Sequence, residues 1–158
     1  MDLITSALTW FALVSAGIMA GVYFTFSVFA MRAFAMLGDE AGARAMQSIN
    51  RVILQSAFLP LFFLSSLACL ALIVLALVGL AGPQGTMLAA GGAAYVLGMT
   101  GVTAAANVPL NNRLEAVDAA IPEGQAVWRD YQARWTRYNH VRTVACVAAL
   151  VLFALALA

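Results

Sequence analysis

The sequence contains few charged residues and no lysine. Only 9% of its 158 residues are charged, whereas 64% are hydrophobic and the mean hydropathy is +0.93. The segments 3–31, 52–112 and 143–158 carry no charge at all. This composition excludes an ordinary soluble domain. Because a charge in hydrocarbon costs at least about 2.5–3.5 kcal/mol, the uncharged segments are expected to lie in a membrane.

The chain is also poor in residues that bind metals or form disulfides. Cys69 and Cys146 both lie in apolar stretches, where a free cysteine packs as a small hydrophobic residue; a disulfide or metal pair is the alternative. His140 is the only histidine, which excludes a haem held by two histidines. No glycine-rich phosphate-binding motif occurs. Nearby acids match the arginines, so nucleic-acid binding is not expected.

Four apolar stretches are long enough to cross a bilayer: 3–31, 52–80, 86–107 and 140–157. The start of the chain has no basic segment and no clean cleavage site, so the first stretch is expected to remain as a transmembrane helix. We therefore predict an all-α fold: a single-domain integral membrane four-helix bundle. Two tandem helical hairpins, 1–80 and 81–158, are one interpretation of it.

All eight arginines and six of the seven acids lie in two segments, 32–51 and 113–142. Residues 39–51 and 124–139 are expected to be helices that run directly into the second and fourth spans and form a polar cap on the bundle. With four spans, both segments lie on one side. The positive-inside rule predicts that this side is cytoplasmic and that both termini are outside, in the plasma (bacterial inner) membrane.

Proline and glycine are expected to shape the spans. Pro60 should kink the second span and open space near the cap, and Pro109 should kink the third near the interface. The space at Pro60 would be lined by Phe58, Phe62 and Phe63. Glycines such as Gly17 let helices approach closely in lipid. They favour packing within the bundle, and a homo-oligomer contact is the alternative.

One helical face of the second charged segment carries aromatic residues. Spacings of 3, 4, 3 and 4 place on that face Trp128, Tyr131, Trp135, Tyr138 and Arg142. Such a stripe is typical of an interfacial aromatic belt. It equally suits the wall of a pocket that holds a flat aromatic ligand, if the stripe faces inward.

Carboxamides gather where the helices meet the membrane. Asn107 and Asn111 are four residues apart and share a helical face. They either satisfy carbonyls freed by Pro109 or hold an oxygen atom of a ligand. Similar positions in the two returning helices are occupied by Gln47, Asn50 and Asn139.

His140 is the candidate general base, because histidine titrates near neutral pH. The alternatives are a polar interfacial residue or a metal ligand. Since one histidine among scattered acids and asparagines makes a thin metal site, no metal site is predicted.

Several segments resemble the anthrone oxygenase-like family of small four-span membrane proteins. They are Asn107-Val-Pro-Leu-Asn-Asn-Arg-Leu114, Trp128, Trp135-Thr-Arg-Tyr-Asn-His-Val-Arg-Thr143, Ala20-Gly-Val-Tyr-Phe-Thr-Phe-Ser27 and Met46-Gln-Ser-Ile-Asn50. The resemblance covers essentially the whole chain. Fungal members are similar to enzymes that oxidise an anthrone to an anthraquinone with molecular oxygen in polyketide biosynthesis.

The resemblance implies an oxygenase activity. From it and from these residues we hypothesise a membrane oxygenase that acts on a lipophilic aromatic ketone or phenol through an enolate. His140 would remove a proton, and Asn107, Asn111 and Arg142 would stabilise the enolate oxygen. The expected substrate-binding residues are Gln47, Asn50, Trp128, Trp135, Tyr138 and Asn139. Molecular oxygen would be the co-substrate without a resident cofactor, and a metal bound through His140 is the variant. The alternative class is a non-catalytic small-molecule-binding or transport-accessory membrane protein.

Overall fold

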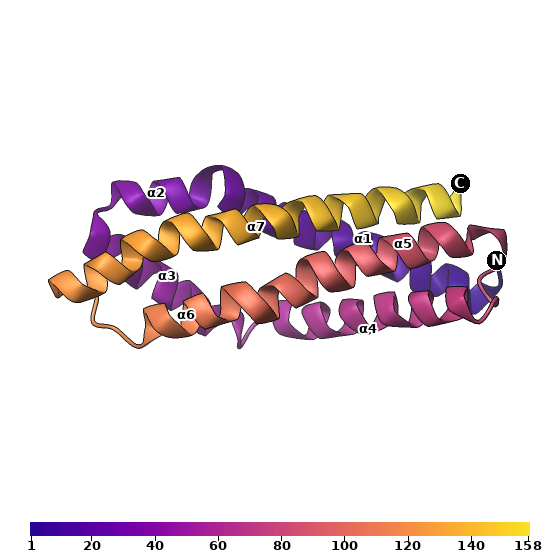
Figure 1. Cartoon of the computed structure of the whole chain (residues 1–158), viewed down its shortest axis with the longest axis horizontal. Coiled ribbons are helices and arrows are strands. Elements are labelled where there is room, and N and C mark those ends of the chain that lie inside the picture. Colours follow the sequence, from indigo (N-terminus) through magenta and orange to yellow (C-terminus); the bar gives the residue numbers. More distant parts are fainter.

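The computed structural model describes all 158 residues and is helical, without strands. Four helical stretches are long and apolar enough to cross a membrane: Leu3–Met36, Phe58–Leu77, Gly82–Glu115 and Pro122–Leu157. They run along one long axis, and both ends of the chain lie at the same end of the bundle (Figure 1). The predicted all-α, four-span architecture is confirmed, and the chain is a multi-pass membrane protein.

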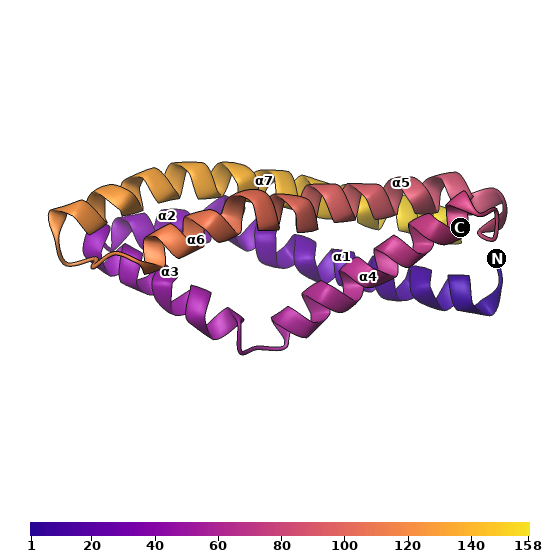
Figure 2. The ribbon, with the colours of Figure 1, turned by 60° about the horizontal axis from the view of Figure 1, so that its bottom comes forward.

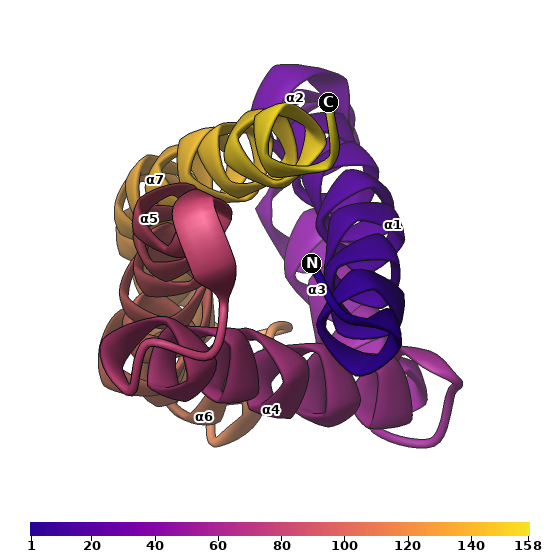
Figure 3. The same cartoon turned by 90° about the vertical axis from the view of Figure 1, so that its right-hand side faces the viewer.

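The long helices form a ring. Each of α1 (Leu3–Thr25), α4 (Phe58–Leu77), α5 (Gly85–Tyr95) and α7 (Pro122–Leu157) packs against two others, in the order α1, α4, α5, α7; Figure 3 shows the ring along its axis. Close approach depends on glycine. A Cβ added at Gly92 would lie 2.8 Å from the carbonyl oxygen of Cys69, whereas one at Gly21 would meet nothing within 4 Å.

At the end of the bundle opposite the termini, four helical segments form the charged cap. They are α2 (Met31–Met36), α3 (Asp39–Ile53), α6 (Val108–Glu115) and the part of α7 before His140. Gly38, with a φ of 87°, makes the turn between α2 and α3. The expected helices over 39–51 and 124–139 are both present. A surface ion pair between Asp39 and Arg129 connects these two helices, and one between Arg51 and Glu115 connects α3 to α6; each contributes little in water.

The second span departs from the prediction. It begins at Phe58, because residues 54–57 separate α3 from α4, and the connection projects from the side of the bundle (Figure 2). The expected continuous helix from 39–51 into this span is therefore wrong. Pro60 causes no kink, since it lies in the first turn of α4, where the missing N–H has no intrahelical partner to lose.

Three short π-helical segments interrupt the spans: Phe26–Ala30, Val96–Gly101 and Thr103–Asn107. The last one ends two residues before Pro109, so the helix near this proline is locally widened. Such segments displace the side chains that follow and are frequent at functional sites.

The buried apolar residues form two separate cores. One lies within the ring of spans and includes Met19, Tyr23 and Tyr95. The other lies under the charged cap and includes Met46, Trp128 and Trp135. A cavity lies between these two cores.

Candidate functional site

The inner cavity lies at the junction of the two cores and has a volume of about 190 Å³. Residues of all four spans and of α3 line it. Its polar lining consists of Tyr23, Asn50, Thr103, Asn111, Trp135 and Arg142. The segments around 47–55, 107–118 and 128–142 therefore converge, and the rings of Trp128, Tyr131 and Trp135 face inward.

Arg142 is the central charge of the cavity. It is only 5% exposed, and its guanidinium donates to the side-chain oxygens of Asn139, at 2.7 Å, and Thr103, at 3.4 Å. The guanidinium carbon lies 4.3 Å from the ring centre of Tyr23 and 4.9 Å from that of Trp135. Nε has no hydrogen-bond partner, and no carboxylate pairs with this arginine.

A buried cation without a carboxylate is costly. The two aromatic faces offset part of this cost through cation–π attraction, of about 0.5–2 kcal/mol each. The remaining positive charge faces the cavity, so the site favours an anion.

Asn139 holds Arg142 in place. Its amide nitrogen donates to the Tyr23 carbonyl and to Ser27 Oγ, both at 2.7 Å. These bonds leave Oδ1 as the acceptor that faces the arginine. All polar atoms of this side chain are thus engaged, and its role is to position the cation.

Asn111 presents a free amide to the cavity. Its Oδ1 accepts hydrogen bonds from Tyr131 Oη and Trp135 Nε1, both at 2.9 Å. Two donors on one oxygen determine the orientation of the carboxamide, and its Nδ2 makes no bond within the chain. The buried Nδ2 of Asn50, which also lines the cavity, has no partner either. The cavity therefore offers a cation and two amide donors to an oxygen atom.

Aromatic rings form the walls. Trp128, Tyr131 and Trp135 stack with ring centres 5.7 and 6.0 Å apart and planes within 24°. Of the three, only Trp135 lines the cavity, where it packs edge to face with Phe26 at a ring-centre distance of 5.5 Å. The opposite wall consists of Phe58, Phe62 and Phe63, in the place the sequence indicated for them.

A family model described as anthrone oxygenase matches residues 51–152, more than half of the chain. The chain belongs to the anthrone oxygenase family. No curated protein and no solved structure matched it. The matched range includes Thr103, Asn111, Trp135 and Arg142, whereas Tyr23 and Asn50 lie before it.

In this member of the anthrone oxygenase family, three further predicted residues lie near the cavity without lining it, as Trp128 and Asn139 do. The Gln47 amide donates to the carbonyls of Leu114 and Val117, at 2.9 and 3.0 Å, and so caps the end of α6. Asn107 is fully buried and donates to the Trp135 carbonyl at 3.3 Å. Neither asparagine of the 107–111 pair bonds a carbonyl near Pro109. Tyr138 packs against the core of the cap.

His140 lies outside the cavity. It is exposed on the outer surface of α7, because successive residues of a helix are about 100° apart and its neighbour Asn139 faces inward. It lines two external grooves, one beside α2 and one beside α5.

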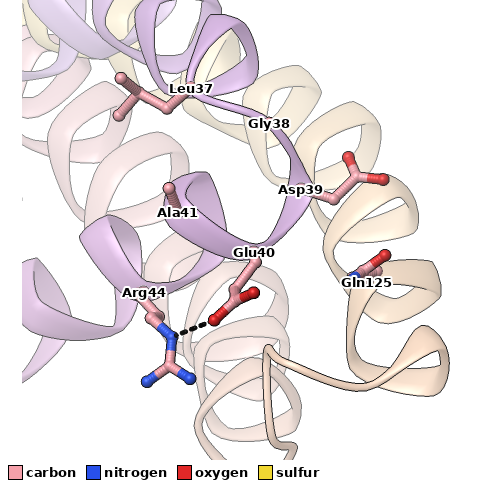
Figure 4. A pocket seen from close by; sticks show the side chains of 7 residues that line it. All are labelled: Leu37, Gly38, Asp39, Glu40, Ala41, Arg44 and Gln125. Atoms are coloured by element: carbon pink, nitrogen blue, oxygen red, sulfur yellow. Dashed lines mark hydrogen bonds and ion pairs between the residues drawn. The ribbon is translucent and has the colours of Figure 1, made fainter.

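Sequence reasoning missed Tyr23, Phe26 and Thr103 as cavity residues. Tyr23 had two signals: it is a tyrosine within an apolar span, and it lies in the family-like segment Ala20–Ser27, which also contains Phe26. Nothing in the sequence indicated the π-helical segments in which Phe26 and Thr103 lie. A further hollow lies at the turn around Gly38 (Figure 4). Its main polar contact is the exposed pair of Arg44 and Glu40, so it lacks the buried donors of the cavity. No three His, Cys, Asp or Glu side chains cluster as metal ligands.

Proposed function

We propose that this protein is a membrane oxygenase that converts a lipophilic aromatic ketone of the anthrone type into a quinone, using molecular oxygen and an enolate. The observation that carries the proposal is the buried guanidinium of Arg142, which has no carboxylate partner. An enolate bound in the inner cavity would supply the missing negative charge.

The charge balance also explains how the enolate would form. A ketone with an acidic C–H loses its proton more readily when its conjugate base lies beside a buried cation. No carboxylate or imidazole lines the cavity. In the proposal the proton therefore passes to water, and the protein contributes by binding the anion more tightly than the ketone.

The lining residues suit a flat substrate. Its oxygen would lie between Arg142 and the free amides of Asn111 and Asn50, a preorganised set of donors. Its rings would lie between Trp135 and the phenylalanines of α4. The volume is below the roughly 300–1,000 Å³ of sites for drug-sized ligands, which favours a planar molecule of a few fused rings.

The reaction balances with oxygen alone. The enolate transfers one electron to oxygen, and the resulting radical and superoxide combine to form a carbon–oxygen bond. Protonation gives a hydroperoxide on a carbon that still carries one hydrogen. Loss of that hydrogen and cleavage of the O–O bond yield the new carbonyl and one water. Overall, one CH₂ group and one oxygen molecule become one C=O group and one water, with oxygen as co-substrate.

The lipophilic substrate would enter from the bilayer. The positive-inside rule places the charged cap in the cytoplasm and both termini outside. The inner cavity would then lie at the cytoplasmic leaflet, within reach of substrates dissolved in the membrane.

The test is to incubate the purified protein with an anthrone and oxygen, and to follow quinone absorbance and oxygen consumption above the uncatalysed rate. Arg142→Met should lower kcat about 100-fold to 1,000-fold, as removal of an oxyanion donor does. Its fold should persist, because an apolar side chain replaces a costly buried charge. Arg142→Lys should retain part of the activity.

His140→Ala is the matched control on the same helix, and its activity should equal that of the native protein. Full activity of Arg142→Met, or loss of activity in His140→Ala alone, would contradict the proposed mechanism. Tight binding of the anthrone without quinone formation would favour the non-catalytic binding class instead.

A further inference from the structure

The eight arginines divide into three groups by their partners. Five are exposed and paired with acids: Arg44, Arg51, Arg113, Arg129 and Arg134. Arg142 is buried in the inner cavity. The remaining two, Arg32 and Arg137, are exposed and pair with no carboxylate. They lie far apart in the sequence, yet both line one external groove.

This outer groove runs between the end of the first span with α2 and the outer surface of α7, and has a volume of about 620 Å³. Besides the two unpaired arginines, it contains His140, Gln132 and Arg129. Arg129 is engaged by Asp39, and no carboxylate lines the groove. The Nε2 of Gln132 is buried without a hydrogen-bond partner. The groove thus presents two free guanidinium groups and a free amide.

An apolar groove lies on the other side of His140. It is lined by Ala93, Ala94, Leu97, Gly98, Val141 and Val144, among others, between α5 and α7. His140 belongs to both grooves. A molecule with an anionic head and a hydrocarbon tail could therefore place each part in a matching surface across this residue.

We propose that the outer groove binds the phosphate of an anionic phospholipid headgroup, with one acyl chain in the apolar groove. Guanidinium groups bind phosphate oxygens through charge-assisted and often bidentate hydrogen bonds. Basic pockets between transmembrane helices hold anionic headgroups in this way. The adjoining apolar groove favours a lipid over a soluble phosphate. This site is separate from the inner cavity and does not depend on the proposed oxygenase activity.

The experiment is a lipid titration of the purified, detergent-solubilised protein, read by native mass spectrometry. Its ligands are phosphatidylglycerol, phosphatidylcholine and glycerol phosphate. Phosphatidylglycerol should bind most tightly. Each arginine near an anionic lipid contributes about fivefold in affinity, so Arg32→Gln with Arg137→Gln should weaken binding about thirtyfold. Arg134→Gln, an exposed arginine one turn from Arg137 that pairs with Asp130, is the matched control and should bind as the native protein does.

Equal binding of phosphatidylglycerol by the double variant and the native protein would overturn the proposal. Equal weakening in Arg134→Gln would also overturn it, because the effect would then be general surface charge. If glycerol phosphate binds as tightly as the complete lipid, the assignment to a lipid fails. Circular dichroism of the double variant checks its fold, which exposed polar substitutions should leave unchanged.

Discussion

Replacing Asn111 by leucine should destabilise the protein by about 2 kcal/mol. The change removes the oxygen that accepts from both Tyr131 and Trp135 while nearly conserving volume. Side-chain hydrogen bonds between membrane helices contribute on average about 0.6 kcal/mol, with a maximum near 1.7 kcal/mol. Two lost bonds therefore amount to about 1–3 kcal/mol. The assay is unfolding by SDS in mixed micelles, followed by circular dichroism.

The neighbouring residue provides the control. Asn112 is exposed and its side chain makes no hydrogen bond, so Asn112→Leu should change the free energy of unfolding by less than about 0.5 kcal/mol. Tyr131→Phe should cost less in the Asn111→Leu background than in the native protein, because the hydroxyl has already lost its acceptor. Equal destabilisation by the two leucine variants, or equal cost of Tyr131→Phe in both backgrounds, would refute the reasoning.

Asn111→Asp separates stability from activity. An aspartate retains an oxygen that both donors can reach, so stability should remain within about 1 kcal/mol of the native value. It also places a carboxylate in the inner cavity with Arg142, since both side chains contact Trp135. The arginine would then have an internal counterion, and oxygenation of an anthrone should be lost. Native activity in this variant would contradict an anionic intermediate at this site.

Three further predictions concern stability. Gly42→Ala should cost about 1–3 kcal/mol, because its Cβ would lie 2.6 Å from the carbonyl oxygen of Phe34 and 2.9 Å from the ring of Trp128; SDS unfolding measures this. Gly92→Ala should be destabilising by a similar amount for the same steric reason, whereas Gly21→Ala, which meets open space, should be neutral or stabilising by up to about 1 kcal/mol. Hydrogen bonds from backbone and side chain lower the pKa of the Asp2 carboxyl below 3.8. Its stabilisation of α1 should therefore be complete above pH 3.8 and lost as the pH falls through the lowered pKa. Below that pKa, the native protein and Asp2→Ala should have the same free energy of unfolding.

The charge distribution was enough to predict the architecture. Uncharged runs identified the four spans, and helix start signals in the charged segments predicted helices that extend the bundle. The break at residues 54–57 was not predictable, because its sequence, Leu-Gln-Ser-Ala, contains no glycine or proline. Pro60 led to the prediction of a kink, although a proline in the first turn of a helix costs little stability and leaves the helix straight.

The candidate site was predictable in position but not in detail. Helical spacing correctly grouped Trp135 with Arg142 on one face, and it placed Tyr138 there as well. The structure instead turns Asn139 fully inward and leaves Tyr138 half-buried. Residues at spacings of three and four share a face only approximately. Which of two adjacent residues of α7 faces inward therefore depends on the hydrogen-bond partners that the first span offers. Here the first span offers the Tyr23 carbonyl and Ser27 Oγ, and the amide of Asn139 donates to both, whereas the next residue, His140, is exposed.

The interruption between α3 and α4 gives the inner cavity one compliant wall. Phe58, Phe62 and Phe63 lie on the first turns of α4, directly after a connection in which turns replace the regular helical hydrogen bonds. Local opening there costs less than opening of a continuous helix. The wall that carries Arg142 and Trp135 belongs to an unbroken helix of 36 residues. A ligand larger than the cavity would therefore displace the phenylalanines of α4, while the Arg142 guanidinium and Asn139, which holds it, keep their positions.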